Sequence, residues 1–159
     1  MSDDLLQPSI GKMVSAPRKM PWRVQSQLWV AFFGGIAAVT TIAILNARRL
    51  GLDRRKQWLM AGAGAVAFGV LLALWLRQPP APTFIDFARG SRELRLIGRV
   101  IAVVLFLLHA LLQKPADAHY RVFAKGDYAS LWGPGIAATF LIGSLQSLLI
   151  IGLAWWVRS

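Results

Sequence analysis

The chain has 159 residues, of which 56% are hydrophobic, and its basic residues outnumber the acidic ones to give a net charge of +11. Soluble domains usually contain about 45–50% apolar residues. The absence of cysteine excludes disulfides, thiolate catalysis and cysteine-held zinc or iron–sulfur sites. The hydrophobic excess lies in four blocks that are apolar on all sides and of membrane-spanning length. This pattern predicts an all-α, polytopic membrane protein with four transmembrane helices in a compact bundle.

The first half of the chain divides into a tail and two spans. Residues 1–27 form a polar, basic tail that contains three prolines and has no hydrophobic period. The first span is predicted over residues 28–47, and it lacks the small-residue cleavage site of a signal peptide. The second span is predicted over residues 58–76, and the proline-rich stretch that follows it stops any helix. We expect the tail to be an addition to a membrane domain over residues 28–157.

The second half holds a connecting segment and two further spans. Residues 83–95 place phenylalanines on one helical face and arginines on another, which favours a short interfacial helix between the second and third spans. The third span is predicted over residues 96–113, where Lys114 and Pro115 end it. The fourth span is predicted over residues 132–157.

Tryptophans mark the expected boundaries independently of hydropathy. Indole prefers the headgroup region, because its ring is apolar and its N–H group requires a partner. All seven tryptophans lie at or near the ends of the predicted spans: Trp22, Trp29, Trp58, Trp75, Trp132, Trp155 and Trp156. The two patterns therefore predict the same boundaries.

The positive charge is interpreted as contact with anionic lipid headgroups rather than with nucleic acid, because the basic residues lie in short segments beside the spans. The residues expected to contact headgroups are Arg48, Arg49, Arg54, Arg55, Lys56, Arg89, Arg92 and Arg95. If four spans alternate in direction, the tail, second loop and C-terminus carry nine basic residues and the other two loops carry eight. A difference of one does not orient the protein. It leaves open insertion in both orientations with antiparallel dimerisation.

Few residues in the spans could carry chemistry. All seven carboxylates lie outside the predicted spans, which argues against a carboxylate-driven antiporter. His109 is interpreted as a neutral side chain bonded to a neighbouring helix rather than as a haem ligand or proton relay. A serine protease pairing of His109 with Ser144 is not favoured, because the sequence around the serine lacks a second glycine. We predict no catalytic, cofactor-binding or metal-binding residue.

Small residues recur at four-residue spacing in three of the spans. Such spacing lets helices approach closely and is typical of helix-packing faces in membranes. The residues expected on these faces are Gly34, Ala38, Ala61, Ala65, Gly69, Gly135, Thr139, Gly143 and Ser147. These faces predict tight packing within the bundle or against a partner.

Short motifs give the chain a family resemblance. The sequences Phe32-Phe33-Gly34-Gly35 and Asn46-Ala47-Arg48-Arg49-Leu50-Gly51, with the segment from Ala118 to Trp132, resemble a group of small bacterial inner-membrane proteins with four spans. The resemblance covers about residues 28–157. The chain departs from that group at Ile36, where a proline is expected. The resemblance implies the fold and a bacterial inner-membrane location, and it implies no activity, cofactor or site residue.

The expected function is non-enzymatic: an accessory or scaffold subunit that packs against other membrane proteins or against itself, surrounded by anionic lipids. The alternative is a small homo-oligomeric transporter or channel in which Thr139, Gly143, Gln146 and Ser147 line a path. A third class, a membrane enzyme, would require a cavity that joins His109 to Ser144 or His119. The three classes therefore predict different surroundings for these side chains: contacts with other helices for the subunit, a path for the transporter and a shared cavity for the enzyme.

Overall fold

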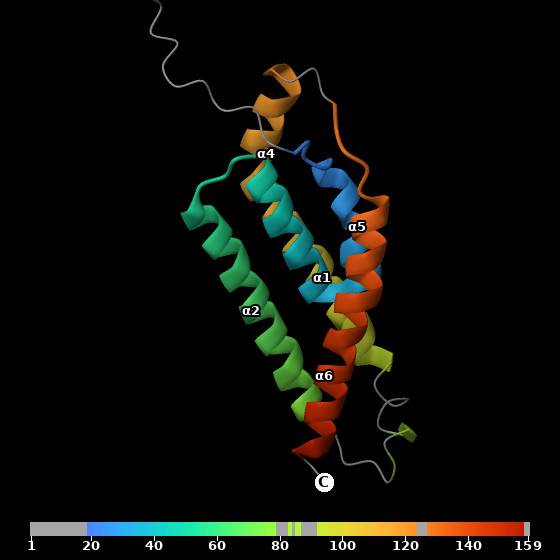
Figure 1. The fold of residues 1–159 in the computed structure, drawn as a ribbon. Helices are drawn as coiled ribbons and strands as arrows, with labels where there is room; N and C mark the ends of the chain where they lie inside the picture. Colours follow the sequence, from blue (N-terminus) through green and yellow to red (C-terminus); the bar gives the residue numbers. More distant parts are fainter. Residues whose placement is uncertain (1–18, 79–82, 84, 87–91, 124–126, 158–159) are drawn as a thin grey trace, which may run out of the picture.

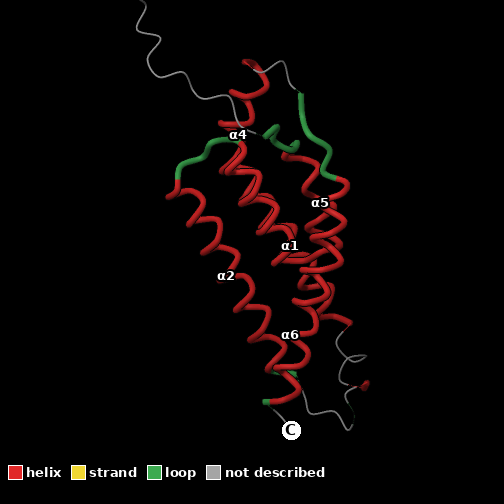
Figure 2. The backbone as a smooth tube through the Cα atoms, in the orientation of Figure 1, coloured by secondary structure: helices red, strands yellow, loops and turns green. Residues whose placement is uncertain are grey.

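The computed structural model describes residues 19–78, 83, 85–86, 92–123 and 127–157 (Figures 1 and 2). The described part is helical and contains no β-strand. Four of its helical segments are long and apolar enough to cross a membrane: Val24–Arg49, Arg54–Leu76, Arg92–Phe123 and Trp132–Trp156. These segments pack against one another, which confirms the predicted fold class.

Two of the connections between the long helical segments are short, whereas residues 77–91 separate the second segment from the third. In chain order they are η2 (Val24–Gln27), α1 (Leu28–Arg49), α2 (Arg54–Leu76), α4 (Arg92–Phe123), α5 (Trp132–Ala137), the π-helix η3 (Ala138–Ile142) and α6 (Gly143–Trp156). Asp53 begins α2 as its N-cap, because its side chain accepts a hydrogen bond from the backbone N–H of Lys56 at 2.9 Å. The last three elements are continuous and form the fourth long segment.

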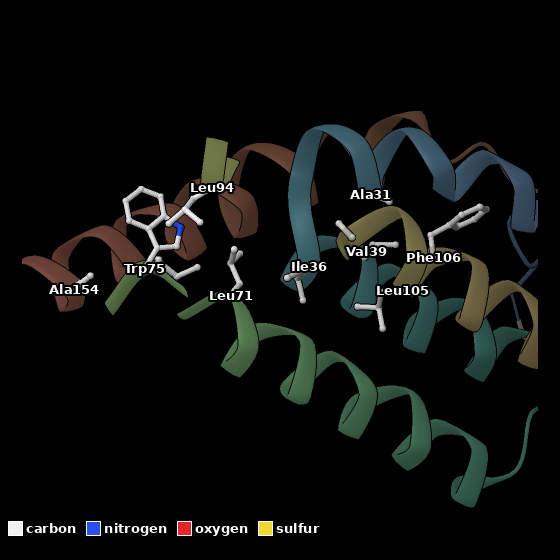
Figure 3. Close-up of a cluster of buried hydrophobic side chains, with 11 residues drawn as sticks. Ala31, Ile36, Val39, Leu71, Trp75, Leu94, Leu105, Phe106 and Ala154 are labelled. Carbon is white, nitrogen blue, oxygen red and sulfur yellow. The ribbon is translucent and has the colours of Figure 1, made fainter. Parts of the chain in front are cut away.

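Helix α1 reverses its direction at Gly35. This residue has φ 76° and ψ −165°, a backbone conformation available essentially only to glycine. An uninterrupted helix of 22 residues would separate its ends by about 33 Å. Instead, the backbone N–H of Trp22 donates to Asn46 Oδ1 at 2.7 Å, and Arg49 Nη1 donates to the carbonyl of Met20 at 2.9 Å. Residues 28–34 and 36–49 are therefore the two arms of a helical hairpin, which Figure 3 shows joined beside Ile36.

The reversal changes the expected course of the chain. An uninterrupted span over residues 28–47 was predicted, with the tail and the first loop on opposite sides of the membrane. Both ends of α1 instead lie at one end of the bundle, while the C-terminal end of α2 and of α6 lies at the other (Figure 1). Hydropathy did not predict this, because both arms are apolar and their combined length is that of a span.

Helix α4 is longer than predicted. It continues through Pro115 to Phe123, whereas the sequence placed its end at residue 113. The turn after the proline contains an ion pair between Asp117 and Arg121 at 3.2 Å, four residues apart. The hydroxyl of Tyr128 also donates to Asp117 at 3.0 Å. The expected interfacial helix over residues 83–95 lies mostly outside the described residues, and its last four residues belong to α4.

The largest buried apolar cluster joins α1, α2, α4 and α6. Ile36 at the hairpin tip, Leu71 of α2, Leu105 of α4 and Ile150 of α6 all belong to it. Figure 3 shows several members of the cluster, with Trp75 beside Leu94 near the far end. The outward faces of α2, α4 and α6 keep many large apolar side chains exposed, which is expected for helices whose solvent is lipid.

Candidate functional site

A buried polar network joins the two arms of the hairpin to α4. Gln27, Asn46 and Gln113 are each 0% exposed. Gln113 Oε1 accepts hydrogen bonds from Asn46 Nδ2 at 2.7 Å and from Gln27 Nε2 at 3.4 Å. Asn46 also accepts the N–H of Trp22 through its Oδ1 atom. The network therefore holds the beginning of the hairpin, its end and α4 together, and its contacts are those of a structural clamp.

His109 lies deeper in the same helix and contacts α2. Its ring is 0% exposed, and its Nε2 atom lies 3.2 Å from the carbonyl oxygen of Met60. The interpretation of His109 as a side chain bonded to a neighbouring helix is therefore confirmed. Ser144 is exposed, and His119 contacts the ring of Phe123. The structure does not bring these three residues together as a membrane enzyme would require.

Asp117 is buried, although the sequence placed it in a connecting segment. It lies in α4 beyond Pro115 and, with Arg23, Arg121 and Tyr128, lines a cavity of about 310 Å³. Burial raises the pKa of the Tyr128 hydroxyl, and its hydrogen bond to Asp117 raises it further. Tyr128 therefore stays protonated at neutral pH and donates to the carboxylate. Within the described ranges, no three histidine, aspartate or glutamate side chains are close enough together to hold a metal ion.

A second cavity, of about 180 Å³, lies at the tip of the hairpin, and we call it the reversal cavity. Gly34 and Gly35 line it from α1, Arg95 and Arg99 from α4, and Gln146 from α6, with Ser147 and several apolar residues completing it. It combines a helix break, two arginines and a buried amide. Sequence reasoning did not predict it, because its residues come together only when α1 reverses.

Gln146 connects the helix break to α6. Its side chain is 8% exposed, and its Oε1 atom accepts a hydrogen bond from the backbone N–H of Ala37 at 2.7 Å. Ala37 is the second residue after the break, where backbone N–H groups have no carbonyl one turn earlier to bond to. The amide thus caps the second arm of the hairpin. Arg99 lies against the first arm, with its guanidinium 5.4 Å from the centre of the Phe32 ring.

Several of the predicted packing residues lie where the hairpin meets the last helix. A Cβ atom on Gly143 would lie 2.7 Å from the carbonyl oxygen of Gly34, and one on Gly34 would lie 3.0 Å from Thr139 Cα. Gly135 packs against the ring of Trp29. Ala38 is fully buried. These close approaches are the ones that small residues permit.

The small residues predicted to form a packing face on the second span do not make its close contact in the bundle. Ala61 is half-buried, Ala65 and Gly69 are exposed, and a Cβ atom on Gly69 would meet nothing within 4 Å. The close contact of α2 is instead made by Gly64, where a Cβ atom would lie 2.5 Å from Thr40 Oγ1. Ser147 is also exposed, and its hydroxyl donates within its own helix, to the carbonyl of Gly143. Ala65 and Gly69 therefore face away from the bundle, because the predicted stripe is out of register with the side of α2 that carries Gly64.

The basic residues expected at headgroups lie at both ends of the described bundle. Those at residues 48–56 lie at the end where the hairpin begins and finishes, and Arg92 and Arg95 lie at the opposite end. Arg89 lies outside the described residues. Arg49 differs from the others, because its guanidinium stacks over the ring of Trp22 at 3.7 Å and bonds to Met20. It secures the tail to the hairpin.

No protein-family model, curated protein or solved structure matches the chain. The resemblance to small bacterial four-span proteins therefore stays a prediction.

Proposed function

We propose that the protein is a non-enzymatic, multi-pass protein of a bacterial inner membrane that acts as an accessory or scaffold subunit for other membrane proteins. The observation that carries this proposal is an open small-residue face on α2. Gly62, Ala65 and Gly69 lie three and four residues apart on one side of the helix and are exposed. A Cβ atom on either glycine would meet nothing within 4 Å. Such a face permits close approach of a further helix.

An apolar groove beside this face supports the same proposal. The groove, of about 460 Å³, lies between α2 and α6 and is lined by Phe68, Leu72, Leu153 and other apolar residues. Gly152 of α6 lines it and has no neighbour within 4 Å of a Cβ position. A transmembrane helix of a partner, or of a second copy, would find an apolar groove with Gly152 on its α6 wall.

Large side chains on the open face of α2 and in the groove test the proposal. After gentle extraction from native membranes, we expect the wild-type protein to migrate in an assembly larger than its own 17.5 kDa chain. Gly69→Leu and Gly152→Leu should each release the partner by occupying the space of its backbone, without lowering the thermal stability of the isolated protein. Val104→Leu, at an exposed position on α4, is the matched control and should leave the assembly intact. A wild-type protein that migrates alone would refute the proposal.

A small homo-oligomeric transporter is the second candidate, and the broken α1 favours it. Helices interrupted at membrane depth are typical of transporter binding sites. Of the residues expected to line a path, Gly143, Gln146 and Ser147 line the reversal cavity, while Thr139 packs against the hairpin. Solute uptake by liposomes that contain the purified protein alone would favour this candidate over the subunit.

The reversal of α1 also orients the protein, and we propose that the hairpin opens toward the cytoplasm. Nine described basic residues belong to the end where the hairpin begins and finishes: Lys19, Arg23, Arg48, Arg49, Arg54, Arg55, Lys56, Lys114 and Arg121. Four belong to the opposite end: Arg77, Arg92, Arg95 and Arg99. Basic segments stay on the cytoplasmic side, so the near balance that a crossing first helix implied becomes a clear bias.

Cysteine labelling tests this orientation, since the chain contains no cysteine of its own. Single cysteines at the exposed positions Gln25 and Arg54 should both react with a membrane-impermeant maleimide from the cytoplasmic side. A cysteine at Thr83 should react from the outside. Labelling of positions 25 and 54 from opposite sides would refute the reversal, and labelling of position 83 from the cytoplasm would refute the orientation. Labelling of every position from both sides would support insertion in both orientations.

A further inference from the structure

We propose that water molecules occupy the interior of the bundle beside α4, where they join the buried ring of His109 to the cavity at Asp117. This inference is independent of the groove between α2 and α6 and goes beyond the subunit proposal. It depends on three fully buried side chains, those of Gln27, His109 and Gln113. Each of them has a polar atom without a hydrogen-bond partner among the described residues.

The hydrogen bonds that the amides already make fix which of their atoms are unpartnered. Asn46 Oδ1 accepts the N–H of Trp22, so Asn46 Nδ2 is the atom that donates to Gln113 Oε1. Turning the Gln113 amide over would place two donor groups against each other. Gln113 Nε2 therefore faces away from Asn46. Gln27 Nε2 donates to the same oxygen, which leaves Gln27 Oε1 with no donor in the described part of the chain.

The ring of His109 adds the third unpartnered atom. Its Nε2 atom lies 3.2 Å from the carbonyl oxygen of Met60, which can only accept a hydrogen bond. In the neutral ring Nε2 therefore carries the proton, and Nδ1 is an acceptor that no described residue satisfies. Leaving a buried polar group without a hydrogen bond is costly, so each of the three atoms favours a bound partner.

The three side chains lie along one face of α4. Gln113 follows His109 by four residues on this helix, so the two side chains lie on the same face. The contact between Gln113 and Gln27 joins η2 to that face. Asp117 continues the face one turn further. Because a helix rises about 1.5 Å per residue, His109 lies about 12 Å from Asp117 along the helix axis.

The cavity at Asp117 connects this face to solvent, because the exposed side chain of Arg121 also lines it. Residues of η2 form its wall together with residues of α4. Gln27 belongs to η2, and Gln113 lies one turn before Asp117 on α4. Water that enters the cavity therefore meets the two buried amides first and His109 one turn deeper.

The unpartnered atoms identify the class of ligand. Gln113 Nε2 is a donor, whereas Gln27 Oε1 and His109 Nδ1 are acceptors. The two acceptors would repel an anion, and the amide N–H groups would repel a cation. A neutral molecule that both donates and accepts satisfies all three atoms, and water is the smallest such molecule. Buried waters typically make about three hydrogen bonds to protein groups that lack another partner.

Polarisation transfer from water, measured by solid-state NMR on the isotopically labelled full-length protein in lipid bilayers, tests the proposal. His119→Asn removes the other, exposed histidine, so that all histidine ring signals come from His109. We expect these signals to build up from water faster than the signal of the Val39 backbone amide, because Val39 is fully buried in the apolar cluster. Build-up at the ring as slow as that at Val39 would overturn the proposal.

Two matched variants, made in the His119→Asn protein, assign the transfer to water held beside the amides. Gln27→Met introduces an apolar side chain of similar length and loses only the long 3.4 Å bond to Gln113, so it should slow the build-up at His109. Gln25→Met makes the same replacement two residues earlier, at an exposed position, and should leave the build-up unchanged. Equal build-up in the two variants would show that Gln27 holds no water and would refute the proposed site.

Discussion

Replacing Gly35 with alanine is expected to lower the free energy of unfolding by about 1–3 kcal/mol, the cost of a backbone conformation that other residues rarely adopt. Gly35 has a positive φ at the point where α1 reverses. A Cβ atom there would also lie 3.2 Å from Gln146 Nε2, so the cap on the second arm would have to shift. Thermal or denaturant unfolding in a mild detergent, followed by tryptophan fluorescence, measures the loss.

Gly62→Ala is the matched control for this prediction. Gly62 lies on the exposed face of α2, where a Cβ atom meets nothing within 4 Å. Because alanine is favoured over glycine inside a helix by up to about 1 kcal/mol, this variant should be as stable as the wild type or slightly more stable. If Gly35→Ala and Gly62→Ala behave alike, the reversal at Gly35 does not exist in the folded protein.

Replacing Asn46 with alanine is expected to cost a similar amount, about 1–3 kcal/mol, because it leaves a buried donor unpaired. The N–H of Trp22 would lose its acceptor, and Gln113 would lose its shortest hydrogen bond. Both losses occur where the tail, the hairpin and α4 meet. We therefore expect the variant to unfold at a lower temperature than the wild type and to be cleaved more readily by protease near the beginning of the hairpin.

Gln25→Ala controls for the loss of an amide from the same region. Gln25 belongs to η2, near the beginning of the hairpin, but is exposed. Its replacement should change the free energy of unfolding by no more than about 0.5 kcal/mol. A wild-type stability for Asn46→Ala would mean that the buried network contributes nothing to holding the hairpin closed.

The tryptophans lie near the segment ends as predicted, but their exposure could not be predicted from the sequence. Trp58, Trp132 and Trp156 are exposed near the ends of the long segments, as expected for headgroup contacts. Trp22 and Trp75 lie near such ends too, but they are 2% and 4% exposed. The sequence predicted the position of these rings along the chain, whereas the side that each ring faces depends on how the helices are rotated in the bundle.

At the candidate site, the sequence likewise predicted which small residues make helix contacts but not the course of the backbone there. Gly34 and Gly143 were expected at helix contacts, and they do meet each other. The Phe-Phe-Gly-Gly sequence gave no reason to expect a reversal, because glycines in membrane helices are common and are usually helical. The reversal becomes visible only through its long-range contacts, such as that between Trp22 and Asn46. Without it, Arg99 and Gln146 have no common cavity to line.

The sequence alone determined that the chain is helical and belongs in a membrane, because apolar blocks of sufficient length have no other stable arrangement in lipid, where every backbone polar group must be bonded within its own segment. It also located five of the six boundaries of the three later segments to within four residues, and missed only the end of α4, which lies at Phe123 rather than at residue 113. Only the tertiary structure decided that α1 turns back on itself. The reversal depends on the backbone conformation of one glycine and on polar contacts between residues far apart in sequence. Neither feature changes the hydropathy of the segment. The reversal in turn decided which basic residues share an end and which side chains meet in the cavity.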